Sequence, residues 1–223
     1  SYMLNSGSFD CCGFNCKVIY ARRRSMCVSI SDDNSVTVRC PLGTSRARIV
    51  SFLQEKLKWI ERNMARNRAV GQEFGEVTAM KKILVEGRFY ELFLGGEDGI
   101  SDCCVSAKDL KNLKKIYVGC FGGQFIARFK EFAGVFGFKY NKVSFRTYRG
   151  RWGCCDGANN IAFNYKLLML PHNLQDCVIA HELCHTVHHD HSPAFHALLD
   201  RVYPSNRADE RQLKRYSFIA RMY

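Results

Sequence analysis

The chain has 223 residues, of which 47% are hydrophobic, so it can bury the core of one large domain or of two smaller ones. This composition excludes a disordered protein. No apolar run reaches the roughly 18 residues of a membrane span, and residues 1–14 lack the basic start and long apolar core of a signal peptide. We therefore expect a cytoplasmic protein that does not enter a membrane.

The net charge of +12 arises from 33 Lys and Arg residues against 21 Asp and Glu residues. Residues 1–70 hold much of the excess, with 12 basic and 5 acidic side chains. This balance permits binding of a nucleotide, a nucleic acid or another polyanion but does not establish it. A solvated surface is the preferred interpretation of two basic clusters, at Arg22–Arg24 and at Lys108, Lys111, Lys114 and Lys115.

Twelve cysteines are present, including the adjacent pairs 11–12, 103–104 and 154–155. None has the C-x-x-C spacing of a zinc ribbon, and their positions suggest no disulfide framework. We expect most of them to be reduced thiols in a reducing compartment.

In chain order, the first half is predicted to be rich in β-structure. Alternating apolar residues predict three short strands that follow one another as a β-meander. Ser45 is a suitable N-cap for a helix that runs to about Ala65. Residues 83–85 and 89–93 predict a hairpin around Gly87. The strands of the meander are Val18–Tyr20, Cys27–Ile30 and Val36–Cys40.

The second half is predicted to be mainly helical. Helices are expected at Phe125–Phe136 and at Ala208–Met222, and strands are expected around Phe145 and at residues 161–163. The fold class is therefore α+β, because strands and helices are largely segregated along the chain.

A polar stretch at residues 97–114 is the best candidate for a domain boundary. We therefore expect a β-rich N-terminal lobe with one long helix over residues 1–118 and a second lobe over residues 119–223. One continuous domain over residues 15–223 is the alternative.

All seven histidines lie in the last quarter of the chain, and two belong to the motif His181-Glu182-Leu183-Cys184-His185. Apolar residues around the motif predict a helix, for which Asn173 is a plausible N-cap. A helix turns about 100° per residue, so His181 and His185 lie one turn apart on one face. Two imidazoles in these positions can hold one metal ion, with Glu182 beside it.

The chemistry of zinc explains why these residue types occur together. Neutral imidazoles bind a tetrahedral Zn²⁺ ion whose fourth position holds water, and the ion lowers the pKa of that water towards about 7. A neighbouring carboxylate can take the proton and later give it to a leaving amine, as the H-E-x-x-H motif does in metallopeptidases. Glu182 is therefore the candidate catalytic base.

The third ligand must come from beyond the motif. In a continuing helix, His188 and His189 would lie roughly 10–12 Å from His181 along the axis, which is too far to share its ion. Ser192 is a natural N-cap and Pro193 a natural first residue for a helix that ends at Val202, so the chain can turn back there. We therefore favour His191 as the third ligand, and Glu210 on the last helix is the alternative.

The remaining candidates in this stretch have simpler interpretations. His188 and His189 fit a solvated helix end, where a protonated imidazole suits the helix dipole. His172 and His196 fit surface or packing positions, although His196 could contact a ligand from the next helix. Cys184 suggests a Cys-His nucleophile, but its side chain points about 100° away from the metal-binding face, so a buried packing thiol is preferred.

Three arginines precede the motif. If residues 143–149 form a strand, Arg149 and Arg151 point to the same side and, together with Arg146, could bind a substrate carboxylate or phosphate through paired hydrogen bonds. A structural salt bridge explains them equally well.

Several blocks of the sequence resemble the YgjP-like metal-dependent hydrolases, a family grouped with the zincin metallopeptidases. These blocks are Phe145–Cys155, Asn160–Asn164, Val178–His185 and His191–Phe195, with further likeness at Arg22–Ser25, Val36–Pro41 and Lys58–Ile60, so that the resemblance covers most of residues 15–205. The chain departs from the family pattern at Cys154, where serine is usual, and at His196, where an aromatic residue is usual.

The resemblance implies a zincin-like catalytic lobe with the metal site on the H-E-x-x-H helix. It implies that His181, His185 and His191 are the ligands and that Glu182 is the catalytic acid and base. It also implies that the strand at Asn160–Asn164 forms the rim of the cleft, where an extended peptide could pair with a free edge.

We therefore expect a zinc-dependent metallopeptidase that acts on a peptide or protein. A metal-dependent hydrolase of nucleotides or phosphate esters, in which Arg146, Arg149 and Arg151 hold the phosphates, is the first alternative. A DNA-associated module that resembles a metalloprotease, with weak or absent activity, is the second.

Overall fold

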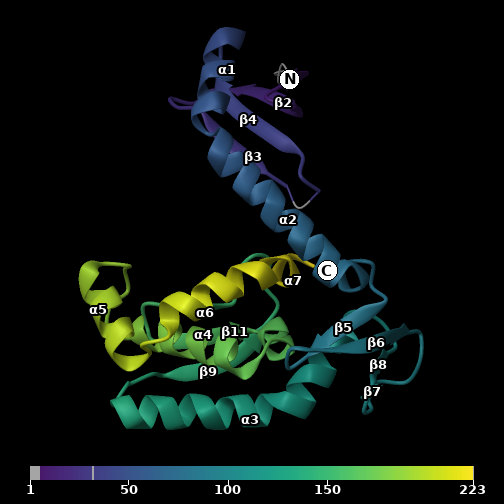
Figure 1. Ribbon diagram of the computed structural model, residues 1–223. Coiled ribbons are helices and arrows are strands. Elements are labelled where there is room, and N and C mark those ends of the chain that lie inside the picture. The colour runs from purple at the N-terminus through teal and green to yellow at the C-terminus, as the bar shows by residue number, and fades with distance from the viewer. Residues whose placement is uncertain (1–5, 32, 223) are drawn as a thin grey trace. The chain divides into compact units, whose positions relative to one another are not determined.

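The computed structural model describes residues 6–31 and 33–222 (Figure 1). Contacts within the chain divide it into two units, of which the first ends at Gly75 and the second begins at Glu76. Both units contain strands and helices, which confirms the mixed α+β class. The expected boundary at residue 118 lies inside the helix α3 (Asn112–Phe136), because the sheet that precedes this helix packs with it in the second unit.

The sheet of the first unit has the strand order β1-β2-β4-β3 and is not the expected β-meander. Strand β2 is parallel to β4, and β3 pairs antiparallel with β4 at the edge. Burial explains this order, because β4 buries Val36, Val38 and Cys40 completely or nearly so, whereas β3 is only half-buried. The strands are β1 (Ser6–Cys11), β2 (Phe14–Ala21), β3 (Cys27–Ile30) and β4 (Val36–Pro41).

Two helices follow in place of the single helix that was expected. Helix α1 (Arg46–Glu55) begins at Ser45, whose hydroxyl accepts from the backbone N–H of Arg48 at 3.4 Å. Lys56 interrupts the helix with φ −94° and ψ 0°, and α2 (Leu57–Thr78) begins directly after it. The first unit has its own core, in which Ile49 and Leu53 of α1 and Ile60 of α2 pack with Val18 and Val38 of the sheet.

The second unit begins with a four-stranded sheet in the order β5-β6-β8-β7. The expected hairpin forms between β5 and β6, and Gly87 at its turn has φ +86°. A Cβ atom at Gly87 would lie 2.6 Å from the Pro171 ring, so glycine allows the hairpin to approach the start of a later helix. The strands are β5 (Lys82–Val85), β6 (Arg88–Leu94), β7 (Gly99–Ile100) and β8 (Cys104–Ala107).

A three-stranded sheet in the order β10-β11-β9 forms the centre of the second unit. In Figure 1 strands β9 and β11 lie over α3. Aromatic rings join these strands to the helix. Phe125 of α3 packs edge-to-face against Phe163 of β11 and Phe145 of β9, with ring centroids 4.9 and 5.3 Å apart. Such contacts stabilise a buried interface beyond area burial alone. The strands are β9 (Lys142–Arg146), β10 (Gly153–Cys155) and β11 (Asn160–Asn164).

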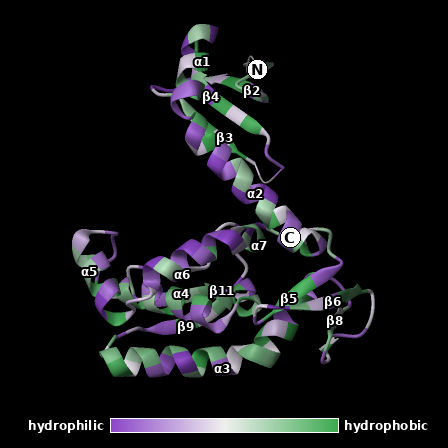
Figure 2. Cartoon of the chain, in the orientation of Figure 1, coloured by the Kyte–Doolittle hydropathy of each residue, from purple (hydrophilic) through white to green (hydrophobic). Residues whose placement is uncertain are grey.

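After β11 come the 3-10 helix η1 (Tyr165–Met169) and the buried helix α4 (His172–Cys184). Arg128 of α3 pairs with Asp176 of α4 at 3.0 Å and thereby joins the two helices. The expected terminal helix is divided into α6 and α7 by the 3-10 turn η2 (Lys214–Tyr216), and Figure 2 shows α6 as mostly hydrophilic. The last helices are α5 (Pro193–Val202), α6 (Asn206–Leu213) and α7 (Ser217–Arg221). No helix in the described part of the chain is long and apolar enough to cross a bilayer.

Lys166 in η1 is fully buried and connects the centre of the second unit to the end of the chain. Its ammonium group donates to the carbonyl oxygens of Ala220, at 3.4 Å, and Met222. Burial lowers the pKa of Lys166 to about 8, and the charge of Arg149 adds to this shift. Burial thus penalises the charged form, which the folded chain keeps only below about pH 8.

Replacing Lys166 by Met should change the pH dependence of stability. The unfolded chain keeps this lysine charged up to about pH 10.5 and the folded chain only up to about pH 8, so the penalty for burying it falls as the pH rises between these values. The free energy of unfolding of the wild type should therefore rise, relative to that of Lys166→Met, by roughly 2 kcal/mol between about pH 7.5 and 9.5.

Urea unfolding followed by Trp152 fluorescence, in a Trp59→Phe background, would report on the second unit alone. Lys130→Met on α3 is the matched control, because the Lys130 side chain is exposed. A difference between wild type and Lys166→Met that stays constant over this pH range would contradict the prediction.

Candidate metal centre

Helix α4 carries the first two candidate ligands. His181 and Glu182 lie in its last turn, and His185 is the C-cap residue, with its backbone N–H 3.2 Å from the carbonyl oxygen of His181. The helix begins at His172 after Pro171 rather than at the expected cap Asn173, whose side chain instead donates to Asp209 at 2.8 Å. The N-cap prediction was therefore wrong because a contact with α6 uses this side chain.

The chain reverses after α4 and returns at α5. His185 already closes the helix, and residues 185–187 form a turn, so His188 and His189 lie in the irregular segment beyond it and not on a continuing helix. Ser192 then caps α5 as expected, with its hydroxyl accepting from the N–H of Phe195 at 3.4 Å, and Pro193 is the first helical residue. This reversal places the residue before the cap, His191, beside α4.

The three histidines form one compact group. The Nε2 atom of His181 lies 3.1 Å from that of His185 and 3.3 Å from that of His191. Nitrogen ligands at the usual zinc distance of about 2.0–2.1 Å are about 3.3 Å apart in a tetrahedral site. The nitrogens of all three residues lie within 4.8 Å of one another, so these residues could hold one metal ion.

Phe195 packs against all three imidazoles. Its ring is fully buried and stacks on His185, with centroids 4.5 Å apart and an angle of 26°. The rings of His181 and His191 each meet it edge-on at 5.0 Å. The Nδ1 atom of His185 is also 2.9 Å from the carbonyl oxygen of His188, which orients Nε2 towards the group.

The surroundings favour neutral imidazoles. Burial lowers the pKa of His181 to about 4, and the neighbouring histidines add to the shift. Burial also lowers the pKa of His185. Neutral imidazole is the form that binds a metal, so these residues are prepared for coordination without first losing a proton.

Glu182 lies in a buried position against strand β10. Its side chain is nearly buried, and its Oε2 atom has no hydrogen-bond partner among the described residues. Burial raises the pKa of Glu182 to about 8, while the charge of Arg151 opposes the rise. A Cβ atom at Gly153 would lie 2.6 Å from Glu182 Oε1, so β10 can lie this close only because glycine stands there.

The other candidate ligands lie elsewhere. Glu210 is not in the group of histidines. Its charge acts on Cys177, which lies one turn before His181 on α4. Burial raises the pKa of Cys177, and the charges of Glu210 and Asp209 raise it further. His172 pairs with Glu86 at 2.7 Å. The ring of His196 is 6.4 Å from that of His191. Cys184 is fully buried, which agrees with the expected packing thiol.

Arg149 and Arg151 do not lie on one side of a strand, contrary to the expectation, because β9 ends at Arg146 and both lie in the following loop. The charge of Arg149 acts on Lys166, whereas that of Arg151 acts on Glu182. The guanidinium of Arg151 lies 5.5 Å over the ring of Tyr148, and the charge of Arg146 acts on the same Tyr148 side chain.

The sequence interpretation missed the residues that support this centre. Asn164 is fully buried and donates to the carbonyl oxygens of Tyr148 and Arg151, both at 3.0 Å, which anchors the arginine loop. A lone asparagine at the end of an apolar strand is the signal that could have indicated this role. Gly153 and Phe195 were noticed only as members of family-like blocks.

A family model described as YgjP-like, metallopeptidase domain, matches residues 24–216 of the chain. No curated protein and no solved structure matches the chain. The matched range includes the three histidines and Glu182 and extends over both units.

Metal content should depend on each histidine of the group. We expect about one zinc ion per chain, and a fall of more than about 100-fold in affinity for His181→Ala, His185→Ala and His191→Ala, since loss of an outer partner alone costs 10- to 100-fold. His196→Ala is the matched control and should keep its zinc. Elemental analysis after dialysis would decide, and full zinc content in His191→Ala with loss in Glu210→Gln would assign the third position to Glu210.

Proposed function

The chain belongs to the YgjP-like metallopeptidase family, and from this premise we propose that it is a zinc-dependent hydrolase of peptide bonds. The observation that carries the proposal is the group of three imidazoles beside a buried carboxyl group with one unpartnered oxygen. Three nitrogen ligands with an open fourth position are typical of catalytic zinc sites.

In this proposal His181, His185 and His191 hold the ion. When bound, zinc would supply an acidified water and polarise the scissile carbonyl group. Glu182, in its ionised form, would take the proton from that water and return it to the leaving amine. Its burial against β10 keeps bulk water away from the carboxyl group and holds it in one orientation.

The substrate would pair with β10 rather than with the strand that was expected. Strand β11 lies between β10 and β9, so Asn160–Asn164 has no free edge. The backbone groups of Trp152 and Asp156 form hydrogen bonds with β11. Hydrogen-bonded residues alternate along an antiparallel strand, so Cys154 also faces β11. The backbone groups of Gly153 and Cys155 therefore point away from the sheet. An extended peptide can bind such an edge through main-chain hydrogen bonds, next to Glu182.

Arg151 would bind a polar group of the peptide beside the scissile bond. Hydrolysis of nucleotides or phosphate esters is the weaker candidate, because it needs several cations around the phosphates, and Arg151 is the one of the three arginines whose charge acts on Glu182. Zinc is the proposed metal because imidazole ligands suit it better than magnesium. The described cysteines are all free thiols, which supports a reducing, cytoplasmic location.

Replacing Glu182 by Gln should abolish hydrolysis while leaving the ligands intact. We expect kcat to fall by about 10²- to 10⁴-fold, the usual contribution of a positioned base, with zinc content unchanged. Quenched fluorescent peptide libraries and nucleoside triphosphates should be tested in parallel with both proteins. Phosphate release by the wild type that is lost in Glu182→Gln, without any peptide cleavage, would overturn the peptidase assignment.

Replacing Gly153 by Ala should displace the Glu182 carboxyl group. The new Cβ atom would lie 2.6 Å from Oε1, so we expect kcat to fall at least about tenfold at equal zinc content. Gly157→Ala in the following turn is the matched control, because a Cβ atom there meets no atom within 4 Å. Equal activities of the two variants would show that the close approach of β10 does not orient Glu182.

A further inference from the structure

Two distant stretches of the first unit line one open hollow of about 280 Å³. Arg24 and Ser25 come from the connection between β2 and β3, Thr44 precedes the N-cap of α1, and Arg48 lies in the first turn of α1. Leu42, which is 62% exposed, lies beside them. The hollow thus combines two guanidinium groups, two hydroxyl groups and an apolar side chain.

Among the described residues, no carboxylate lines this hollow or pairs with its arginines. None of its lining residues is acidic, the first turn of α1 contains no acidic residue, and within the described chain neither Arg24 nor Arg48 takes part in a salt bridge. The neighbouring Arg46 is placed differently, with its guanidinium 4.6 Å over the ring of Phe9. Arg24 and Arg48 therefore offer unpaired donors to a ligand.

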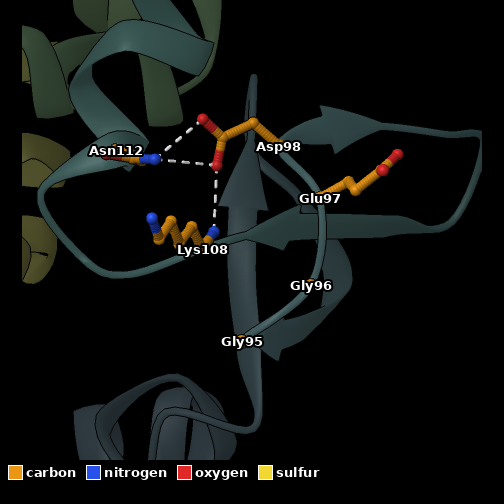
Figure 3. A pocket seen from close by; sticks show the side chains of 6 residues that line it. All are labelled: Gly95, Gly96, Glu97, Asp98, Lys108 and Asn112. Atoms are coloured by element: carbon orange, nitrogen blue, oxygen red, sulfur yellow. Dashed lines mark hydrogen bonds between the residues drawn. The ribbon is translucent and has the colours of Figure 1, made fainter.

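Two open hollows of the second unit differ in this respect. In the one shown in Figure 3, Asp98 accepts from the backbone N–H of Lys108 and from the side chain of Asn112. In the other, Glu86 is paired with His172 at 2.7 Å. Carboxylate side chains of the chain itself line both of these hollows, so an external anion is favoured at the hollow of the first unit.

The positive charge also extends beyond the hollow. Residues 1–75 contain 12 Lys and Arg against 6 Asp and Glu residues, an excess of six within a third of the chain. Arg22, Arg39 and Arg46 are among the exposed members. A charge spread over a whole unit attracts a ligand with repeated negative charges more strongly than a single small anion.

We propose that the first unit binds a single strand of nucleic acid, with one backbone phosphate held between Arg24 and Arg48. Planar guanidinium groups bind phosphate oxygens through paired hydrogen bonds. The Thr44 hydroxyl already donates to the carbonyl oxygen of Pro41 at 2.8 Å, so Ser25 supplies the hydroxyl donor. Leu42 offers an apolar contact to the sugar or base.

This proposal is independent of the peptidase chemistry, because none of its residues belongs to the second unit. A nucleic acid is favoured over an acidic peptide because an apolar side chain directly beside two arginines suits a sugar or base attached to a phosphate. Preferential binding of an acidic peptide is a separate possible outcome of the experiment that follows.

The full chain should be titrated against a fluorescein-labelled single-stranded DNA of about 20 nucleotides, and fluorescence anisotropy measured at several salt concentrations. We expect the double variant Arg24→Ala, Arg48→Ala to bind at least about tenfold more weakly. Its plot of log affinity against log salt should be less steep by about 0.7, the contribution of one phosphate contact on a single strand. Zinc content and peptide hydrolysis should not change.

The double variant Lys58→Ala, Arg62→Ala removes the same charge from the exposed face of α2 and should bind within about threefold of the wild type. Leu42→Glu keeps both arginines and adds a carboxylate at an exposed position, so it should weaken binding even if the arginine variant fails to fold. Equal losses in the arginine and α2 variants, no binding by the wild type, or competition by polyglutamate as strong as that by unlabelled DNA would each overturn the proposal.

Discussion

The packing of Phe195 against three imidazoles is the contact on which the candidate centre depends. The ring stacks on His185 and meets His181 and His191 edge-on, so it fills the space below all three. This contact requires the chain to reverse after α4 and to begin α5 at Ser192. One buried aromatic residue thereby holds together ligands from a helix and from the loop that follows it.

A second constraint is the close approach of β10 to α4. Gly153 lets the strand lie against Glu182, and the buried Asn164 anchors the preceding loop through the carbonyl groups of Tyr148 and Arg151. The same strand presents its free edge beside the carboxyl group. The elements that orient the proposed base are thus those that would position a peptide, which links the fold of the central sheet to the proposed reaction.

The two units divide the chemistry of the chain between them. The second unit contains the histidines and Glu182, whereas the first unit has its own core and an unpaired pair of arginines around an open hollow. A small basic module joined to a hydrolase could bring the enzyme to an anionic partner without changing its active site. The sequence interpretation treated Arg22–Arg24 as a solvated surface because Arg48, the residue that completes the hollow, lies far away along the chain.

The sequence by itself determined the features that depend on neighbouring residues. The spacing of His181 and His185, the capping of α5 by Ser192 and Pro193, and the hairpin at Gly87 follow from the geometry of a single helix or turn, and the structure contains all of them. Burial of the Cys184 thiol followed in the same way from its position on the helix.

Tertiary structure decided whatever required a choice among distant partners. It placed β4 between β2 and β3, gave the free edge to β10 instead of β11, and set the charge of Arg151 against Glu182 and that of Arg149 against Lys166. Each of these outcomes depends on the apolar area that whole elements bury against one another and on which polar groups then find partners. Local sequence patterns do not determine these buried areas or these polar partners, so only the packing of the whole chain decides them.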